Sequence, residues 1–288
     1  MKFLRWISVS LLLQAIFASS ATNLYAQTSE SWAKHNRYIE LYSGSHQQNY
    51  QEEDTQGLTT NGILDSETGS QEHFGAAVRW QATNGWLVHL QAQRQSGTTH
   101  YNGHLQSGSG TLTQYRAFTG NVATQLAVQV GYALNSDTLR AIPAHLQITP
   151  LVQLGENRWQ RNLVQYSEAY RYTTTAVGAQ LQWQARPGTV LEVQAIVGQT
   201  GAATVNVNSL GFVAQQPGAA MRQWHVGVGQ DLGRLLDAEA FRGWRLIARY
   251  SQSTVAHDAS PLVNGLQAPP NQHQPSEWVI GLQRQFSN

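Results

Sequence analysis

The sequence predicts an all-β protein, a transmembrane antiparallel up-and-down β-barrel of about ten strands, with eight or twelve strands as alternatives. Three observations indicate this fold. Extended segments recur along the chain, and within each one apolar side chains alternate with small or polar ones. The connections between these segments are alternately short and long. The last segment, residues 277–286, is apolar on one face and closes on the aromatic Phe286, as a membrane-spanning strand requires.

The N-terminus carries the features of a secretory signal peptide. A charged start precedes a short apolar core at residues 6–18, and cleavage is expected after Ala26, with Ala21 as the second candidate. The apolar run is too short to span a membrane as a helix. The sequence therefore predicts three parts: a signal peptide at 1–26, a periplasmic N-terminal segment at 27–36 and an outer-membrane β-barrel at 37–288.

The composition excludes several classes of site. The chain contains no Cys, so it has no disulfide, no thiolate metal ligand and no Cys nucleophile. Charged residues make up 12% of the chain and the net charge is +1, which suits a protein whose surface lies largely in lipid and gives no case for nucleic acid as a partner.

Ten segments show the alternation between an apolar and a polar face. They lie at residues 37–45, 74–82, 86–93, a long segment that ends at 134, 146–154, 177–184, 191–198, 223–229, 244–251 and 277–286. In the segment at 86–93, for example, Trp86, Val88 and Leu90 share one face, while His89 and Gln91 lie on the other. The apolar face is predicted to meet lipid and the other face to line the lumen.

The lengths of the connections predict which end of the barrel is periplasmic and which is extracellular. Asn84-Gly85 is a strong hairpin signal, because both residues tolerate the positive φ that a tight turn needs. An even number of strands places both termini in the periplasm. Short periplasmic connections are expected at 83–85, 135–144, 185–188 and 233–243, the last with one helical turn at 237–241, and long extracellular ones at 46–73, 97–112, 157–170, 200–221 and 256–275.

Four tryptophans fall on the predicted lipid face near predicted periplasmic ends. They are Trp80, Trp86, Trp183 and Trp244. Tryptophan prefers the interface between membrane and water, so these residues are expected to form an aromatic girdle. The alternative is a soluble β-sandwich with ordinary core tryptophans. The conjunction of signal peptide, girdle, asymmetric loops and closing strand favours the barrel.

At these residues the chain resembles the outer-membrane β-barrel proteins of Gram-negative bacteria. The terminal pattern Trp278-x-Ile280-x-Leu282-x-x-x-Phe286 is similar to the strand signal that the barrel-assembly machinery reads, although Ser287 and Asn288 follow the Phe. Residues 62–69 resemble loops of functionally uncharacterised small barrels. The resemblance implies residence in the outer membrane, with its lipids, lipopolysaccharide and the assembly machinery as partners.

Six charged residues are predicted to meet in the lumen. They are Glu40, Arg79, Glu192, Asp231, Arg245 and Arg249. Glu40 with Arg79, and Asp231 with Arg245, are possible cross-strand pairs. Two interpretations remain: a hydrogen-bonded plug that stabilises a narrow barrel, or a selectivity constriction in a small pore.

The loops contain weak candidates for catalysis and for metal binding. A protease-like rim would use His257 and Asp258, with His46 or His100, and a Ser/His pair would use Ser276 and His273. The ten His residues show no metal-ligand spacing, so neither a metal nor a cofactor is expected. Acidic residues at 52–54, Asp65 and Glu67 are a possible calcium site or simply solvated loop residues.

Arg158, Trp159 and Arg161 lie just past the fifth segment, at the predicted extracellular rim. They are either a contact for lipopolysaccharide phosphates, to which Arg is suited, or a girdle Trp with solvated arginines. The extracellular ligand stays unknown. Three functions remain, in this order: a non-enzymatic barrel for surface interaction or envelope integrity, a small porin-like channel, and a barrel hydrolase that acts on protein or lipid.

Overall fold

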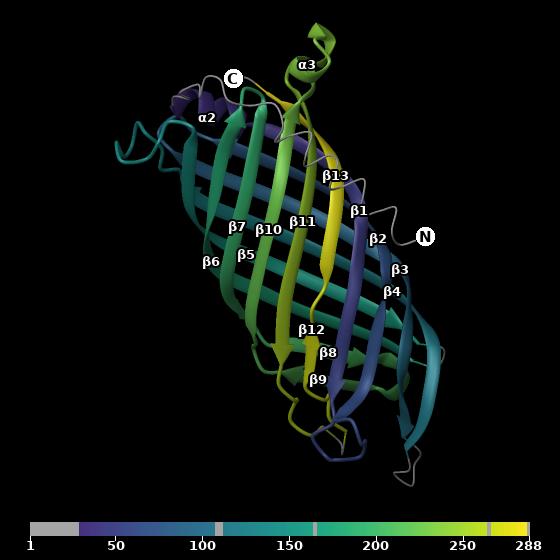
Figure 1. The fold of residues 1–288 in the computed structure, drawn as a ribbon. Coiled ribbons are helices and arrows are strands. Elements are labelled where there is room, and N and C mark those ends of the chain that lie inside the picture. The colour runs from purple at the N-terminus through teal and green to yellow at the C-terminus, as the bar shows by residue number, and fades with distance from the viewer. Residues whose placement is uncertain (1–28, 107–111, 164–165, 264–265, 287–288) are drawn as a thin grey trace.

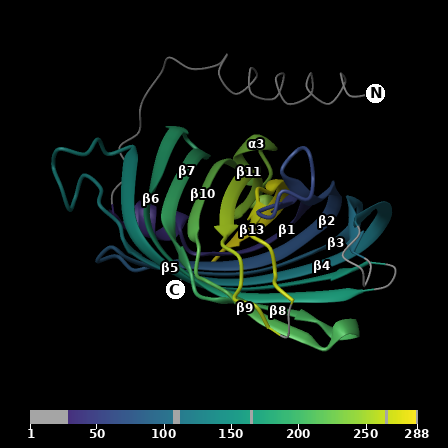
Figure 2. The same cartoon turned by 90° about the horizontal axis from the view of Figure 1, so that it is seen from below.

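The computed structural model describes residues 29–106, 112–163, 166–263 and 266–286, so the predicted signal peptide lies outside the described residues. Ten antiparallel strands close into an up-and-down barrel, which confirms the predicted fold (Figures 1 and 2). The barrel strands are β1 (Tyr38–Glu53), β2 (Ile63–Gln81), β3 (Trp86–Gln106), β4 (Leu112–Tyr132), β5 (Leu146–Asn162), β6 (Ser167–Arg186), β7 (Thr189–Thr200), β10 (Ala220–Asp231), β11 (Trp244–His257) and β13 (Ser276–Gln285).

The last strand closes the ring. β13 pairs with β11 on one side and with β1 on the other, where Leu41 lies opposite Leu282. Closure leaves no free edge within the ring, so the backbone N–H and C=O groups of the strands find partners inside the barrel wall. Within the described ranges, no helix is long and apolar enough to cross a membrane.

The four connections that the sequence predicts to be short, 83–85, 135–144, 185–188 and 233–243, all lie at one end, which we call the turn end. Helix α2 (Ser29–His35) and the C-terminus lie at the same end (Figure 1). Gly85 turns with a φ of 98°, as the Asn-Gly signal predicts. The predicted helical turn in the fourth connection becomes two: α3 (Leu232–Leu235) and the 3-10 helix η2 (Glu239–Phe241). We call the opposite end the loop end.

The strands extend much further toward the loop end than the sequence predicts. β3 and β4 have 21 residues each, about 70 Å of extended chain, whereas a tilted strand needs only about 9–11 residues to cross a bilayer. The predicted loops at 46–73, 97–112 and 157–170 are therefore largely strand, and the expectation of long loops there is wrong. The apolar alternation stops where the outer face leaves the lipid, but the pairing of the backbone continues beyond it.

Two other predicted loops also contain strands at the loop end. The connection at 200–221 forms a hairpin of β8 (Ala203–Val207), the 3-10 helix η1 (Asn208–Leu210) and β9 (Phe212–Gln216), and β8 pairs with β6. The connection at 256–275 holds β12 (Asn271–His273), which bridges β11 and β1. A small apolar core ties these parts together: Tyr170, Val205, Val207, Phe212, Ala214 and Ala268.

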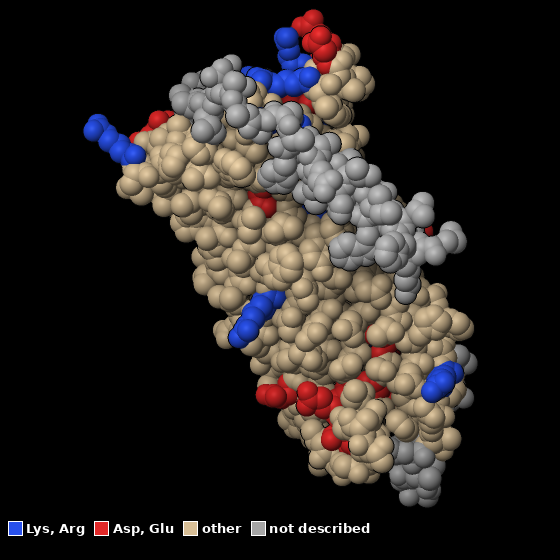
Figure 3. Space-filling model, viewed as in Figure 1, with Lys and Arg blue, Asp and Glu red and all other residues tan. Residues whose placement is uncertain are grey.

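The outer wall follows the predicted alternation. Ile39, Leu41 and Phe74 are exposed, whereas Tyr38 and Tyr42 on the same strands' inner face are buried. Figure 3 shows that the visible wall between the two ends carries few charged side chains. Exposed apolar residues on a wall of this extent are what a barrel in lipid requires.

Candidate functional site

The lumen near the turn end holds a layer of ion pairs, which we call the turn-side layer. Arg79 Nη1 lies 2.9 Å from Glu192 Oε2, and Arg249 Nη2 lies 3.1 Å from Glu40 Oε1. The pairs join β2 to β7 and β11 to β1. The expected pair of Glu40 with Arg79 is wrong, because Arg79 reaches across the lumen to β7, whereas Glu40 reaches past β13 to Arg249 on β11.

The expected pair of Asp231 with Arg245 is not formed either, because both side chains have other partners. Arg245 donates to Gln283 Oε1 at 3.0 Å and to Nδ1 of His35 at 2.7 Å. Asp231 lies opposite Arg245 in the β10–β11 register, but its carboxylate accepts from the backbone N–H of Arg234 and caps α3. Asp231 therefore belongs to the turn and not to the turn-side layer.

Helix α2 closes the turn end of the lumen. Trp32 and Ala33 are fully buried, and the Trp32 indole N–H donates to the carbonyl of Ala144 at 3.3 Å. Asn36 follows the helix and donates to Gln81 and Gln182, 2.7 and 2.9 Å away. From the sequence, residues 27–36 are expected only to be a periplasmic segment. The feature of the sequence that could have indicated docking is Trp32, a single large apolar side chain in a mostly polar segment.

We expect docking of α2 to weaken at acidic pH. Burial, and then the Arg245 guanidinium, hold the pKa of His35 well below its ordinary value, so the docked imidazole stays neutral. Below a pH of about 6.5 the released helix binds a proton that the docked helix does not, and docking is lost progressively as the pH falls. Above that pH the docked state keeps its full stability.

Protease cleavage of the N-terminal segment at pH 8 and pH 5 measures this effect. Cleavage should be faster at pH 5 in the wild-type protein. The variant His35→Gln keeps an acceptor for Arg245 and cannot titrate, so its cleavage should change less with pH. An equal pH dependence in both proteins would contradict the role of His35.

A layer of glutamines fills the middle of the lumen. Gln93 donates to Gln125 at 2.6 Å, and Gln129 donates to Gln153 at 2.7 Å. Tyr42 accepts from Gln91 at 2.6 Å. Primary amides both donate and accept, so neighbouring glutamines satisfy one another without net charge. An apolar patch packs on the inner wall beside them, formed by Leu151, Ala176, Ile196, Ala219, Met221 and Val255.

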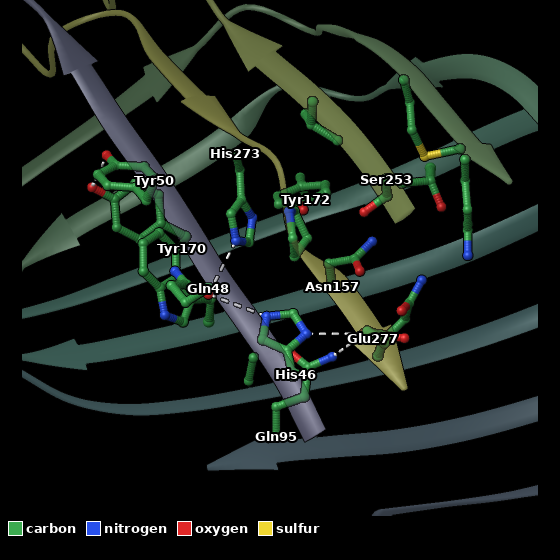
Figure 4. Close-up of a pocket in the computed structure, with 18 of the residues that line it drawn as sticks. His46, Gln48, Tyr50, Gln95, Asn157, Tyr170, Tyr172, Ser253, His273 and Glu277 are labelled. Carbon is green, nitrogen blue, oxygen red and sulfur yellow. Dashed lines mark hydrogen bonds and ion pairs between the residues drawn. The ribbon is translucent and has the colours of Figure 1, made fainter. Parts of the chain in front are cut away.

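A histidine–glutamate network lies next toward the loop end (Figure 4). His46 Nδ1 lies 3.0 Å from Glu277 Oε1, and His46 Nε2 lies 3.2 Å from Gln48 Oε1. The same Gln48 oxygen is 3.1 Å from Nε2 of His273, and Ser251 donates to Glu277 at 3.0 Å. The network borders a cavity of about 100 Å³.

The loop end of the lumen contains a buried cation surrounded by carboxylates, which we call the Arg161 cluster. Arg161 is 2.6 Å from Glu168, 3.0 Å from Glu52 and 3.6 Å from Glu67. Its guanidinium also lies 4.9 Å from the ring centre of Tyr50. Sequence reasoning missed this cluster, although its residues keep the period-two spacing of the inner face beyond the segments assigned as strands.

The Arg161 cluster corrects two expectations. Arg161 and Trp159 face the lumen, where Trp159 stacks on Tyr170, and only Arg158 faces outward. The three residues therefore do not form one lipopolysaccharide contact, because side chains alternate along β5. Glu52 and Glu67, for which a calcium site and a solvated loop were the two alternatives, are buried and surround Arg161 instead. Among the residues that the structure describes, no group of His, Asp and Glu is arranged to hold a metal ion.

The candidate catalytic pairs are not brought together in the described ranges. His257 is buried and lies 3.2 Å from Thr200, whereas Asp258 is exposed. His273 points into the lumen, and Ser276 shares the outward face of β13 with Trp278. His100 also faces outward, beside Phe118. His46 has an orienting carboxylate, but Gln48 occupies the position where a nucleophile would stand.

The predicted girdle residues lie on the outer face at the turn end. Trp86 packs edge-on against Tyr132, and Trp244 lies beneath the Arg284 guanidinium. Trp80 is exposed and Trp183 is half-buried. A second aromatic group lies further along the wall: Tyr250 on β11 contacts Trp224 on β10 and Trp278 on β13.

The residues of the expected assembly signal lie on the closing strand. Trp278, Ile280 and Leu282 are exposed on the outer face of β13. Phe286 follows the strand, and its backbone N–H donates to the carbonyl of Arg37 at 3.1 Å. The recognition of this pattern by an assembly machinery stays a prediction.

No protein-family model matches this chain, and no curated protein matches its sequence. Solved structures match its fold. The outer membrane protease OmpT from Escherichia coli has 9% identity, with 87% of this chain and 97% of that chain covered and a TM-score of 0.58. The β domain of the Bordetella autotransporter BrkA has 12% identity, 86% and 100% coverage and a TM-score of 0.41. Ail of Yersinia pestis has 11% identity, 87% and 99% coverage and a TM-score of 0.33.

At these identities the likeness concerns the fold alone. The chain has the fold of Gram-negative outer-membrane β-barrels.

Proposed function

We propose that this protein is an integral protein of the bacterial outer membrane with a non-enzymatic role in surface interaction or envelope structure. Its barrel is closed to solutes and serves as a rigid support for the wall at the loop end. One observation carries this proposal: polar layers and a docked helix fill the lumen from the turn end to the Arg161 cluster.

The cavities along the lumen are small. Those bordered by the turn-side layer, by the glutamine layer and by the histidine–glutamate network have volumes of about 40, 30 and 100 Å³. Cavities of this size hold one to a few water molecules. Cross-lumen hydrogen bonds and ion pairs lie between them, and a solute could pass only by breaking these contacts. The geometry thus favours a plug over the porin-like alternative.

The loop end supplies a surface for contact outside the membrane. β2 to β6 continue beyond the apolar part of the wall, and the hairpin of β8 and β9 pairs with β6 beyond the end of β7. Thr68, Ser70 and Thr98 are polar outward residues there, and Phe118 and Val213 are exposed apolar ones. A long, paired wall of this kind presents a fixed surface to a partner at little cost in conformational entropy.

Conductance across a planar lipid bilayer tests the closed lumen. We expect no stable single-channel steps from the wild-type protein, with a porin reconstituted in the same way as the positive control. Heat-modifiable migration on gels verifies that the inserted protein is folded. Stable, reproducible steps would replace the proposal with the small-channel function.

The separation of the candidate catalytic residues supports the part of the proposal that the role is non-enzymatic. A separate assay tests this part. We expect no turnover on a panel of protease, lipase and deacylase substrates. Turnover that disappears in the variants His46→Ala or His273→Ala would contradict this part of the proposal and leave the closed lumen unaffected.

A further inference from the structure

A groove of about 640 Å³ runs along the outer wall over β1 to β5. Leu41, Phe74 and Leu126 supply apolar surface within it. Arg94, Thr124 and Arg158 line it as well. The groove therefore combines surface for hydrocarbon with two cations and the carboxylate of Glu156, on the side of the wall that faces away from the lumen.

The cations lie where the apolar part of the wall ends. Along β3 the outward residues from the turn end are Trp86, Val88, Leu90 and Ala92, and Arg94 follows them. The segment from Trp86 to Arg94 has nine residues, and a strand tilted by about 45° needs about 9–11 residues to cross the hydrocarbon core. Arg94 thus stands at the membrane interface nearer the loop end.

One row of the sheet brings the groove's polar side chains together. In the register of the sheet, Arg94 on β3 lies opposite Thr124 on β4, and Thr124 lies opposite Arg158 on β5. Arg158 in turn lies opposite Arg171 on β6. Strands are about 4.8 Å apart, so the Cα atoms of Arg94 and Arg158 are about 10 Å apart with Thr124 between them. Two long arginine side chains can meet on one anion at that spacing.

The charges in this row do not balance. Glu156 Oε1 is 2.7 Å from Arg158 and 2.9 Å from Arg171, and these two arginine side chains remain 62% and 64% exposed. Among the described residues, Arg94 has no ion-pair or hydrogen-bond partner. Glu156 is the carboxylate within ion-pairing distance of this row among the described residues, which leaves two of its three guanidinium charges uncompensated there; Glu72 is exposed on β2, diagonal to Arg94, but forms no ion pair with it. At the membrane interface such cations cost little on the outer wall, and their excess charge attracts an anionic headgroup.

We propose that this groove binds a phosphorylated glycolipid of the outer leaflet, a proposal that rests on the proposed outer-membrane location. A phosphate monoester lies between Arg94 and Arg158 and accepts from the Thr124 hydroxyl, while an acyl chain follows Leu41, Phe74 and Leu126. Guanidinium groups bind phosphate oxygens bidentately. A monoester carries close to two negative charges, which matches the row, whereas the phosphodiester of a common phospholipid carries one.

Lipid binding in nanodiscs of phosphatidylcholine tests the proposal, with lipid A that carries two phosphate monoesters as the probe and native mass spectrometry as the readout. We expect the double variant Arg94→Ala, Arg158→Ala to bind lipid A at least tenfold more weakly than the wild-type protein. Arg222→Ala is the matched control, because Arg222 is exposed on the outer face of β10, three strands beyond β5. Its binding should equal that of the wild-type protein.

Two further measurements use only the wild-type protein. Lipid A stripped of its phosphates should bind as weakly as phosphorylated lipid A binds to the double variant, and phosphatidylglycerol should compete poorly. Equal binding of the stripped lipid, or equal binding by the double variant, would overturn the proposal. Full competition by phosphatidylglycerol would overturn the choice of a glycolipid. Bilayer conductance does not depend on this groove, so failure here leaves the closed lumen untouched.

Discussion

The variant Arg161→Leu is expected to lower the free energy of unfolding by about 3–5 kcal/mol, since removing one partner of a buried ion pair leaves uncompensated charge. Arg161 is 2% exposed, and Glu52 and Glu67 beside it are 6% and 0% exposed. Without the guanidinium these carboxylates and that of Glu168 would face one another in a narrow lumen. Urea unfolding in detergent, followed by heat-modifiable migration on gels, measures the loss.

The same strand supplies the control. Arg158 lies three positions before Arg161 but faces outward, and Arg158→Leu should change the stability by less than about 0.5 kcal/mol. Adding Glu52→Gln and Glu67→Gln to Arg161→Leu should restore part of the lost stability, because both substitutions remove buried negative charge. The account of the Arg161 cluster fails if Arg161→Leu and Arg158→Leu unfold at the same urea concentration.

The variant Trp32→Ala is expected to release helix α2 from the turn end. Trp32 is fully buried, and truncation of a buried Trp costs about 3–5 kcal/mol. A loss of that size lowers the ratio of docked to free helix by about 150-fold to 5,000-fold. The hydrogen bonds of Asn36 to Gln81 and Gln182 remain in the variant, but they lose the packing that holds the helix over them.

Trypsin cleavage after Arg37 in the folded, detergent-solubilised protein measures this release. The cleavage rate should rise strongly in Trp32→Ala while the barrel stays heat-modifiable. Lys34→Gln is the matched control, because Lys34 is exposed on the same helix and its replacement should leave the rate at Arg37 unchanged. Equal resistance of the two variants would show that Trp32 does not anchor the helix.

The fold was predictable because its main signal is local. Alternation along a strand depends only on the pleat of the backbone, so Trp86, Val88 and Leu90 could be assigned to lipid and His89 to the lumen without any neighbour. The ends of the strands toward the loops were not predictable in this way. There both faces are polar, the contrast that marks a membrane strand disappears, and only the pairing of the backbone shows that β3 and β4 continue.

The charges in the lumen show the same difference between what the sequence predicts and what it does not. Arg79, Glu192, Glu40 and Arg249 face the lumen in the structure, but Glu40 meets Arg249 and not the expected Arg79. A cross-strand pair can be inferred from two adjacent strands, whereas Arg79 and Glu192 meet across the barrel, 113 positions apart in the chain. Their distance depends on the diameter and register that all the strands set together.

The sequence by itself determined that the chain forms a β-barrel, which faces meet lipid and lumen, and at which end the short turns lie. Only the tertiary structure decided which lumen charges meet, that α2 enters the turn end, and that Arg94, Thr124 and Arg158 form one row on the outer wall. The physical reason is the range of each interaction. The direction of a side chain follows from its own strand, but its partner follows from the closure of the whole sheet.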